Sequence, residues 1–235
     1  MRYSEPLIQG TLIKRYKRFL CDVIIDTTGQ TVTAHCPNSG SMKGIPLENT
    51  PVMLSYQPSP SRKLHYTLEM INNGPIWIGV NTGIPNMLTE EAIMANEIAE
   101  LAGYSEIRRE VKYGKNSRID LLLGGSEGLC YVEVKNVTLV SEDYAIFPDS
   151  VTTRGQKHLV ELMNVKNEGH RSVMMFIIQR TDCNRFRPAY EIDPDYATLF
   201  TEAMRQGVDA YAYQARVTPE KITIERSIPI DWPRS

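Results

Sequence analysis

The chain has 235 residues, of which 42% are hydrophobic and 23% charged, and its formal net charge is −2 at pH 7. These values are typical of a globular protein with one large domain or two small ones, and they give no overall attraction to nucleic acid. No apolar run approaches the roughly 20 residues of a membrane-spanning helix, and there is no secretory pattern, so we expect no membrane partner. The four cysteines lie far apart without a C-x-x-C pair, which favours free thiols in a reducing cytoplasm over a structural zinc site.

Residues 1–83 are predicted to form a small β-barrel. Apolar stretches separated by turn residues, without helical periodicity, occur at 12–25, 30–36, 51–56, 65–70 and 75–80. Short strands at this spacing are typical of small barrels. We therefore expect a first domain over 1–83 that has a nucleic-acid-binding role.

Helical periodicity first appears at 87–103. Further helices and strands are predicted in alternation at 153–169, 172–180, 193–207, 208–217 and 221–228. This alternation indicates an α/β (α+β) domain with a mixed sheet. We place it at 84–235, with the boundary near 82–87.

The segment 117–139 has the pattern of a β-hairpin around GGSEG, yet three ionisable residues interrupt its apolar runs. If Gly124 pairs with Leu129 around a four-residue loop, Asp120 lies directly opposite Glu133, with Cβ atoms roughly 4.5–5.5 Å apart. Lys135 shares the face of Glu133 because strand side chains repeat every two residues. Burying these charges is costly unless they are paired or bind a metal ion.

Two carboxylates this close repel each other unless a proton or a cation lies between them. A hard ion such as Mg²⁺ or Mn²⁺ prefers one or two carboxylates together with waters and phosphate oxygens. We therefore predict metal-assisted phosphodiester hydrolysis, with Asp120 and Glu133 as metal ligands and Lys135 as a catalytic residue. The alternative is a Lys–Glu pair on a solvent-facing strand beside an unrelated aspartate. Asp149, in a polar loop after Phe147, is interpreted as a turn residue.

Two accessory residues are predicted on helices. Glu97 lies about 60° from the centre of the apolar stripe of the first helix and would be a third metal ligand, or else an exposed residue at the edge of that stripe. Gln156 would contact a bound strand as part of the catalytic set, or else belong to a capping box at the start of its helix. Arg154, Lys157 and His158 add donors there, where a phosphate would be favoured.

Two further segments are candidate nucleic-acid contacts. The cations of KRYKR are Lys14, Arg15, Lys17 and Arg18. They would bind phosphates, or else protect a strand edge against aggregation. The loop 35–44 contributes His35, Asn38, Ser39 and Lys43. It would bind a phosphate through backbone N–H groups and hydroxyls, or else be a tight barrel loop with locally satisfied side chains.

The spacing of SRID and EVK resembles the PD-(D/E)xK nuclease superfamily, with Ile119 where the motif name has proline. A wider set of segments is similar to the bacterial sugar fermentation stimulation protein A family over essentially the whole chain: LIKRYKRFLCDV, HCPNSGSMKG, VNTGIPN, EVKYGKNSRID, YVEVKNVTL and FPDSVTTRGQKHL. The resemblance implies an OB-like barrel, a nuclease-like C-terminal domain, DNA binding and a link to the regulation of sugar (maltose) metabolism genes. By position, it assigns Asp120, Glu133 and Lys135 to the catalytic trio, with Glu97 and Gln156 at accessory helix positions.

We predict a cytoplasmic protein that binds DNA and hydrolyses phosphodiesters with Mg²⁺ or Mn²⁺. The first alternative is a non-catalytic DNA-binding regulator that retains the nuclease fold, because a fold alone does not establish an activity. A small-ligand or nucleotide sensor is a third option. Single- and double-stranded DNA are both compatible with the sequence, as is a homo-oligomer.

Overall fold

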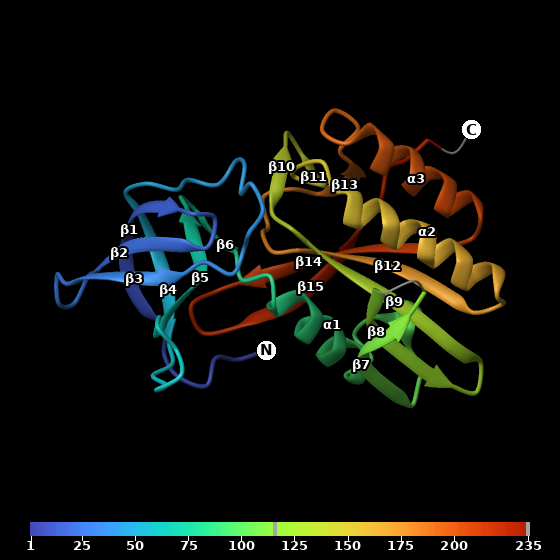
Figure 1. Cartoon of the computed structure of the whole chain (residues 1–235), viewed down its shortest axis with the longest axis horizontal. Helices are drawn as coiled ribbons and strands as arrows, with labels where there is room; N and C mark the ends of the chain where they lie inside the picture. The colour runs from blue at the N-terminus through green and yellow to red at the C-terminus, as the bar shows by residue number, and fades with distance from the viewer. Residues whose placement is uncertain (115–116, 234–235) are drawn as a thin grey trace.

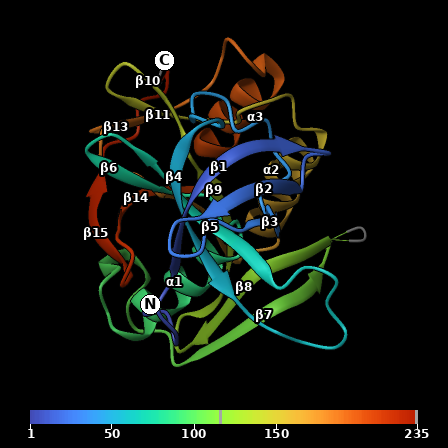
Figure 2. The ribbon, with the colours of Figure 1, turned by 90° about the vertical axis from the view of Figure 1, so that its left-hand side faces the viewer.

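The computed structural model describes residues 1–114 and 117–233 and consists of two lobes that lie side by side (Figure 1). The first lobe is a barrel built from β1 (Ile8–Tyr16), β2 (Leu20–Ile25), β3 (Thr31–His35), β4 (Thr50–Tyr56), β5 (Tyr66–Asn73) and β6 (Ile76–Gly79). Its strand order is β3-β2-β1-β4-β5-β6, and a parallel pairing of β3 with β5 closes it. Figure 2 looks onto this barrel, with the second lobe behind it.

The stretch 12–25, predicted as one strand, is a hairpin of β1 and β2. Lys17 and Arg18 adopt φ angles of 49° and 68° in the connecting turn. Such left-handed conformations reverse the chain without glycine at a modest energetic cost. The expected small barrel is thus confirmed, with one more strand than the sequence indicated.

The second lobe is organised around a six-stranded mixed sheet in the order β15-β14-β12-β9-β8-β7. Its strands are β7 (Glu106–Tyr113), β8 (Ser117–Gly125), β9 (Gly128–Val137), β12 (Arg171–Ile178), β14 (Asp209–Val217) and β15 (Ile222–Ile228). The central strands β9, β12 and β14 are parallel, and the outer pairs are antiparallel. A small sheet of β10 (Leu139–Ser141), β11 (Tyr144–Phe147) and β13 (Arg185–Pro188) lies beside it. The α/β fold is therefore confirmed.

Helices cover both faces of this sheet. They are α1 (Ile84–Met94), the short 3₁₀ helix η1 (Ala99–Leu101), α2 (Thr153–Asn167) and α3 (Pro194–Arg205). Strand β12 is buried on both faces: its side chains at 174, 176 and 178 join the core under α2 and α3, and those at 173, 175 and 177 join the core under α1. This explains its continuous apolar sequence, which is typical of parallel strands between two helical layers.

The barrel and the second lobe share part of one hydrophobic core. Met53 and Met70 of the barrel belong to the same buried cluster as the apolar face of α1. Gly79 N donates to Gln179 O at 2.9 Å, and a Cβ at Gly79 would meet the Gln179 side chain at 2.4 Å. Only glycine therefore permits this approach of the two lobes.

The N-terminal segment crosses back from the barrel to the second lobe. Met1 O accepts from Ile222 N at 3.0 Å, and Arg2 forms a β-bridge with Lys221. Met1, Tyr3 and Leu7 pack against the core that α1 covers. The four cysteines are free and buried. In the described ranges, no helix is long and apolar enough to span a membrane.

Because the core extends across both lobes, we expect them to unfold together. Met70→Ala should lower the free energy of unfolding by about 2–5 kcal/mol, since it removes a fully buried side chain at the junction. Met94→Ala, at a position that is 71% exposed, is the matched control and should change it by less than about 0.5 kcal/mol. Urea unfolding followed by circular dichroism and by tryptophan fluorescence checks this. Two separate transitions would contradict the shared core.

Candidate functional site

The β8–β9 hairpin has the predicted register. Leu121 pairs with Val132 and Gly124 with Leu129, and the same register brings Asp120 opposite Glu133. The loop is shorter than expected, because Gly125 also pairs with Gly128 and only two residues lie between them. The three charged side chains are thus brought to one place beside the centre of the sheet.

Asp120 is held by two hydrogen bonds. Its Oδ1 accepts from Asn86 Nδ2 of α1 at 2.9 Å, and its Oδ2 accepts from Val134 N of β9 at 2.8 Å. The carboxylate therefore bridges a helix and a neighbouring strand, and its orientation is fixed from both sides.

The backbone beside Asp120 is strained. The β7–β8 ladder runs on either side of Glu110 and Asp120 but does not include them, and Glu110 has a φ of 54°. A left-handed conformation at a non-glycine residue costs of the order of 1–3 kcal/mol and is found preferentially at functional sites.

Glu133 is 2% exposed, and its two carboxylate oxygens differ. Oε1 accepts from Lys135 Nζ at 2.6 Å and contacts His158 Nδ1 of α2. Lys135 Nζ and His158 Nδ1 are 3.1 Å apart. Oε2 is buried and has no hydrogen-bond partner in the described part of the chain. Several other buried side-chain atoms in the described chain also lack a partner, but this oxygen belongs to a carboxylate beside a second carboxylate, which is where a cation would bind.

The two carboxyl groups have opposite pKa shifts. Burial, and then the negative charge of Glu133, raise the pKa of Asp120 above its ordinary value, although Val134 N, Lys135 and Asn86 oppose this. Burial also acts to raise the pKa of Glu133, but the Lys135 ammonium and the contact with His158 outweigh it, and the pKa is lowered. Glu133 therefore loses its proton more readily than Asp120, and a cation between the two groups would relieve the repulsion on Asp120.

This pair suits a hard divalent ion. Among the residues described, no three His, Cys, Asp or Glu side chains form a cluster that could hold a metal ion. Mg²⁺ does not need such a cluster, because it retains several waters and is bound through one or two carboxylates. The unpartnered Oε2 of Glu133 and the repelled carboxyl of Asp120 supply that donor set.

The predicted placement of Glu97 is wrong. Helix α1 ends at Met94, Asn96 follows with a φ of 56°, and Glu97 is an exposed residue outside the helix. The helix also begins three residues earlier than predicted. Glu90 lies one turn from Asn86 on the same face, at the i, i+4 spacing. It is paired with Arg109 of β7. Asn86 is the α1 residue that bonds Asp120, and Glu90 lies next to it on the helix. Glu90 was not predicted from the sequence.

Gln156 does not face the trio. Its Nε2 donates to Asp193 Oδ1 at 3.0 Å and thereby connects α2 to the residue that caps α3. Gln156 does not form the capping box that was its alternative role either. The N-cap of α2 is Thr152, whose Oγ1 accepts a hydrogen bond from Gly155 N at 3.0 Å. The α2 side chain that reaches Glu133 is His158, which the sequence analysis had named only as a donor near the start of the helix.

The arginines of KRYKR contact the barrel itself. Arg15 Nη2 donates to Asn38 O and Gly40 O, each at 2.9 Å. Arg18 Nε donates to Ser39 O at 2.9 Å. Arg15 therefore has a structural task, in contrast to the predicted phosphate contact. Of the two lysines, Lys14 lies 3.8 Å from Asp22 and over the ring of Tyr16, while Lys17 is exposed.

The loop 35–44 is a tight loop that anchors the barrel to the second lobe. Asn38 is buried, and its Oδ1 accepts from Gly40 N at 2.9 Å. Asp149 Oδ2 accepts from Ser41 Oγ at 2.9 Å and from Met42 N at 3.2 Å. Of the other candidates here, His35 ends β3, and Ser39 and Lys43 are exposed. Asp149 is therefore an interdomain residue and not part of the trio.

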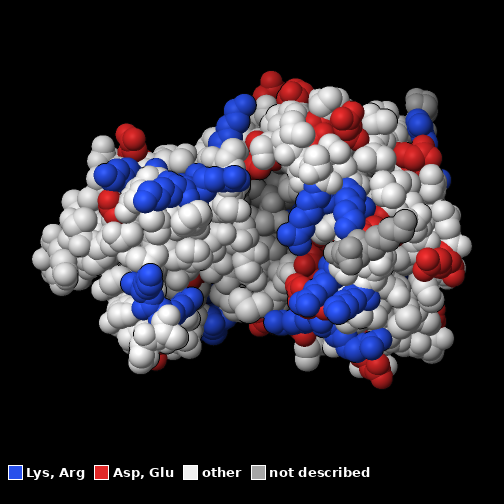
Figure 3. All heavy atoms as spheres, in the orientation of Figure 1, with Lys and Arg blue, Asp and Glu red and all other residues white. Residues whose placement is uncertain are grey.

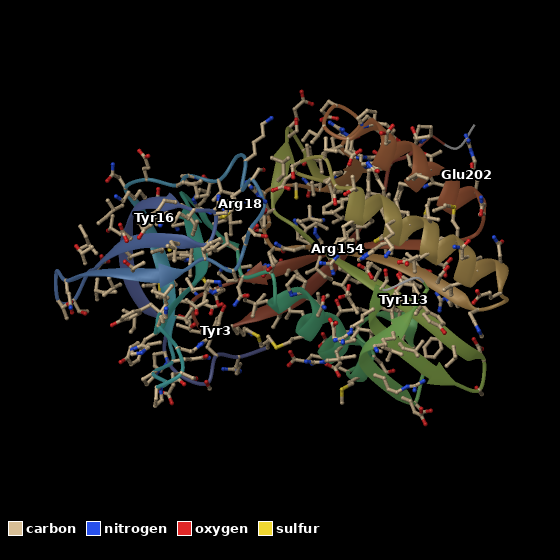
Figure 4. The ribbon with its side chains drawn as sticks, in the orientation of Figure 1. Tyr3, Tyr16, Arg18, Tyr113, Arg154 and Glu202 are labelled. Atoms are coloured by element: carbon tan, nitrogen blue, oxygen red, sulfur yellow. The ribbon has the colours of Figure 1, made fainter. Side chains whose placement is uncertain are left out.

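Cations gather around a hollow between the two lobes (Figure 3). Arg18 on the barrel and Arg154 on the second lobe lie on opposite sides of it (Figure 4). Arg154 and Lys157 are exposed on the first turns of α2, and His158, from the same turns, is in contact with Glu133. The hollow is thus a positively charged surface beside the carboxylate pair, although the net charge of the chain is negative.

The raised pKa of Asp120 predicts a pH-dependent stability. The folded protein holds the Asp120 proton more tightly than the unfolded chain, so this carboxyl lowers stability as the pH rises from about 3.9 through its raised value. In metal-free protein, Asp120→Asn should therefore be more stable than wild type at neutral pH, and the difference should vanish at low pH. Asn86 can rotate its amide to present oxygen to the new side chain.

Urea unfolding between pH 3.5 and 8 in the presence of a chelator checks this, with the exposed Asp26→Asn as a control for the loss of one negative charge. A variant less stable than wild type across this range would show that the two hydrogen bonds to Asp120 outweigh the repulsion.

Comparison with known proteins places this site in a family. A family model described as "Sugar fermentation stimulation protein RE domain" matches residues 83–221, and one described as "SfsA N-terminal OB domain" matches residues 13–80. Sugar fermentation stimulation protein homologs from Geotalea uraniireducens (strain Rf4) and Rhizobium meliloti (strain 1021) are 53% and 47% identical to the chain. The alignments cover 98% and 99% of this chain and 99% and 98% of those proteins. The solved structure of Pyrococcus furiosus SfsA in complex with Ca²⁺ matches with a TM-score of 0.89 at 27% identity, over 98% of both chains. The chain therefore belongs to the sugar fermentation stimulation protein family.

Proposed function

We propose that this protein binds DNA in the hollow between its lobes and hydrolyses phosphodiester bonds with the help of a divalent metal ion. The observation that carries the proposal is the grouping of Asp120, Glu133 and Lys135, in which one buried oxygen of Glu133 has no partner in the described chain. A protein that only binds DNA has no use for adjacent carboxylates that repel each other.

Asp120 and Glu133 would hold Mg²⁺ or Mn²⁺, which when bound supplies Lewis-acid polarisation of a phosphoryl oxygen and a water of lowered pKa. Asn86 and Val134 N orient Asp120 for this task. The structure of the Pyrococcus furiosus relative in complex with Ca²⁺, another hard cation that takes oxygen ligands, supports a divalent-ion site in this family.

Lys135 carries the positive charge closest to the reacting centre. Its Nζ is 2.6 Å from Glu133 Oε1 and its side chain is 13% exposed, so the ammonium is held in place and partly shielded from water. A fixed cation in such a setting stabilises the negative charge that develops on a phosphate in the transition state. His158 of α2 contacts Glu133 Oε1, the oxygen that also accepts from Lys135. This leaves Oε2 as the oxygen available to a metal ion.

Metal binding separates the roles of these residues. Calorimetry should detect Mn²⁺ or Mg²⁺ binding to wild-type protein, and Asp120→Asn and Glu133→Gln should each abolish it, because a neutral amide is a poor substitute for a carboxylate toward a hard cation. Lys135→Met should bind the ion at least as tightly, since Glu133 loses a competing cation, yet it should lose cleavage of labelled single- or double-stranded DNA.

Wild-type protein that binds no divalent ion, even with DNA present, would overturn the hydrolase proposal. The non-catalytic DNA-binding regulator would then be the better account of the fold. Metal binding that survives Glu133→Gln would instead place the ion elsewhere.

The hollow should bind DNA through cations of both lobes. Arg18→Gln on the barrel and Arg154→Gln on α2 should each flatten the slope of log K against log salt by up to ~0.9 for duplex DNA, and by roughly 2 when combined. Arg205→Gln, at an exposed position near the end of α3, removes the same charge away from the hollow and should leave the slope unchanged. Fluorescence anisotropy over a series of salt concentrations measures these slopes. If only one of these two variants changes the slope, the DNA contacts only the lobe that carries that residue.

A further inference from the structure

A pocket lies beside the carboxylate pair, between β8 and the first turns of α2. Its volume is ≈ 360 Å³, within the range of small-molecule pockets. It is lined by Glu110, Ser117, Arg118, Arg154, Lys157 and His158. Three of these six residues carry a fixed positive charge and one carries a negative charge.

The two arginines of this pocket are only weakly engaged by the protein. The side chain of Arg118 is exposed and makes no hydrogen bond or ion pair within residues 1–114 and 117–233. Arg154 Nε lies 3.5 Å from His158 Nε2, which is the limit of a hydrogen bond. Lys157 Nζ lies 3.6 Å from Glu161 Oε1, so an anion in the pocket would share this lysine with a carboxylate.

His158 connects the pocket to the carboxylate pair. It is 4% exposed, and its two ring nitrogens face different partners. Nδ1 contacts Glu133 Oε1, whereas Nε2 lies toward Arg154 in the pocket. A group bound in the pocket would therefore lie one imidazole ring away from Glu133.

We infer that this pocket binds a phosphate monoester, either the phosphorylated end of a nucleic-acid strand or a mononucleotide. Arg118 and Arg154 bring two guanidinium groups to one pocket, and a monoester presents three terminal oxygens to such donors, whereas a phosphodiester within a strand presents only two. Arginine guanidinium groups present forked donors that suit the oxygens of a phosphate. For a strand end, the inference rests on the proposed function, and it implies that cleavage occurs within a few nucleotides of a phosphorylated terminus.

Binding to the metal-free protein tests the pocket without relying on catalysis. Calorimetric titration with inorganic phosphate, and then with a mononucleotide, should detect binding to wild-type protein. Arg118→Gln and Arg154→Gln should each weaken it by about tenfold or more, because each removes a charge-assisted hydrogen bond. Arg205→Gln, with the same charge change, should bind as wild type. Thermal melts confirm that the variants are folded.

Oligonucleotides of one sequence with a 5′-phosphate, a 3′-phosphate or only hydroxyl ends identify the source of the monoester. A preference of about tenfold or more for one phosphorylated end, lost in Arg118→Gln, supports a strand-end pocket. Equal binding of all three, with mononucleotide binding retained, assigns the pocket to a free nucleotide. Absence of phosphate and nucleotide binding, or binding that both variants retain, would overturn the inference. Because a chelator is present throughout, failure of the proposed metal chemistry would leave these results unchanged.

Discussion

The burial of the Glu133 carboxylate in the middle of the sheet is the constraint on which the rest of the site depends. A carboxylate at 2% exposure is strongly destabilising unless opposite charges or hydrogen-bond donors surround it. Lys135 comes from the same strand and His158 from α2, so the strand and the helix must both be in place before this charge is tolerated. The compensation is directed at one oxygen only. The other oxygen, Oε2, is the one that we propose binds the metal ion.

The two lobes contribute different physical properties to the proposed activity. The second lobe supplies a rigid sheet, covered on both faces, that positions the carboxylates, while the barrel supplies the opposite wall of a charged hollow. Two sets of contacts fix the position of one lobe against the other. They are the shared core around Met70 and the hydrogen bonds from Ser41 and Met42 to Asp149. DNA in the hollow would thus contact two surfaces with a fixed separation.

Local patterns in the sequence were sufficient for most of the elements and for the hairpin register, because the glycines of the β8–β9 turn and the alternation of its strands are local signals. The sequence missed two kinds of feature: element bounds without a clear local pattern, and side-chain contacts that depend on tertiary structure. Helix α1 ends at Met94 because Asn96 leaves the helical conformation, and periodicity alone did not reveal this. Strand β7 is polar along an exposed edge and lacks an apolar signal. The imidazole of His158 meets Glu133 across 25 positions of sequence, and two of the carbonyls that Arg15 binds lie more than 20 residues away. Side chains are assigned to such partners by packing and not by spacing.

The crossing of the N-terminal segment onto β15 has a consequence for synthesis on the ribosome. The residues that meet there are separated by 221 positions, so the segment around Met1 must wait until β15 has been synthesised before these contacts form. A contact of this sequence separation is slow to form because a long loop must close first. The barrel strands are complete much earlier in translation. The nascent barrel would therefore be exposed without its docking partner, with the methionines at the lobe junction open to solvent and to chaperones until β15 emerges.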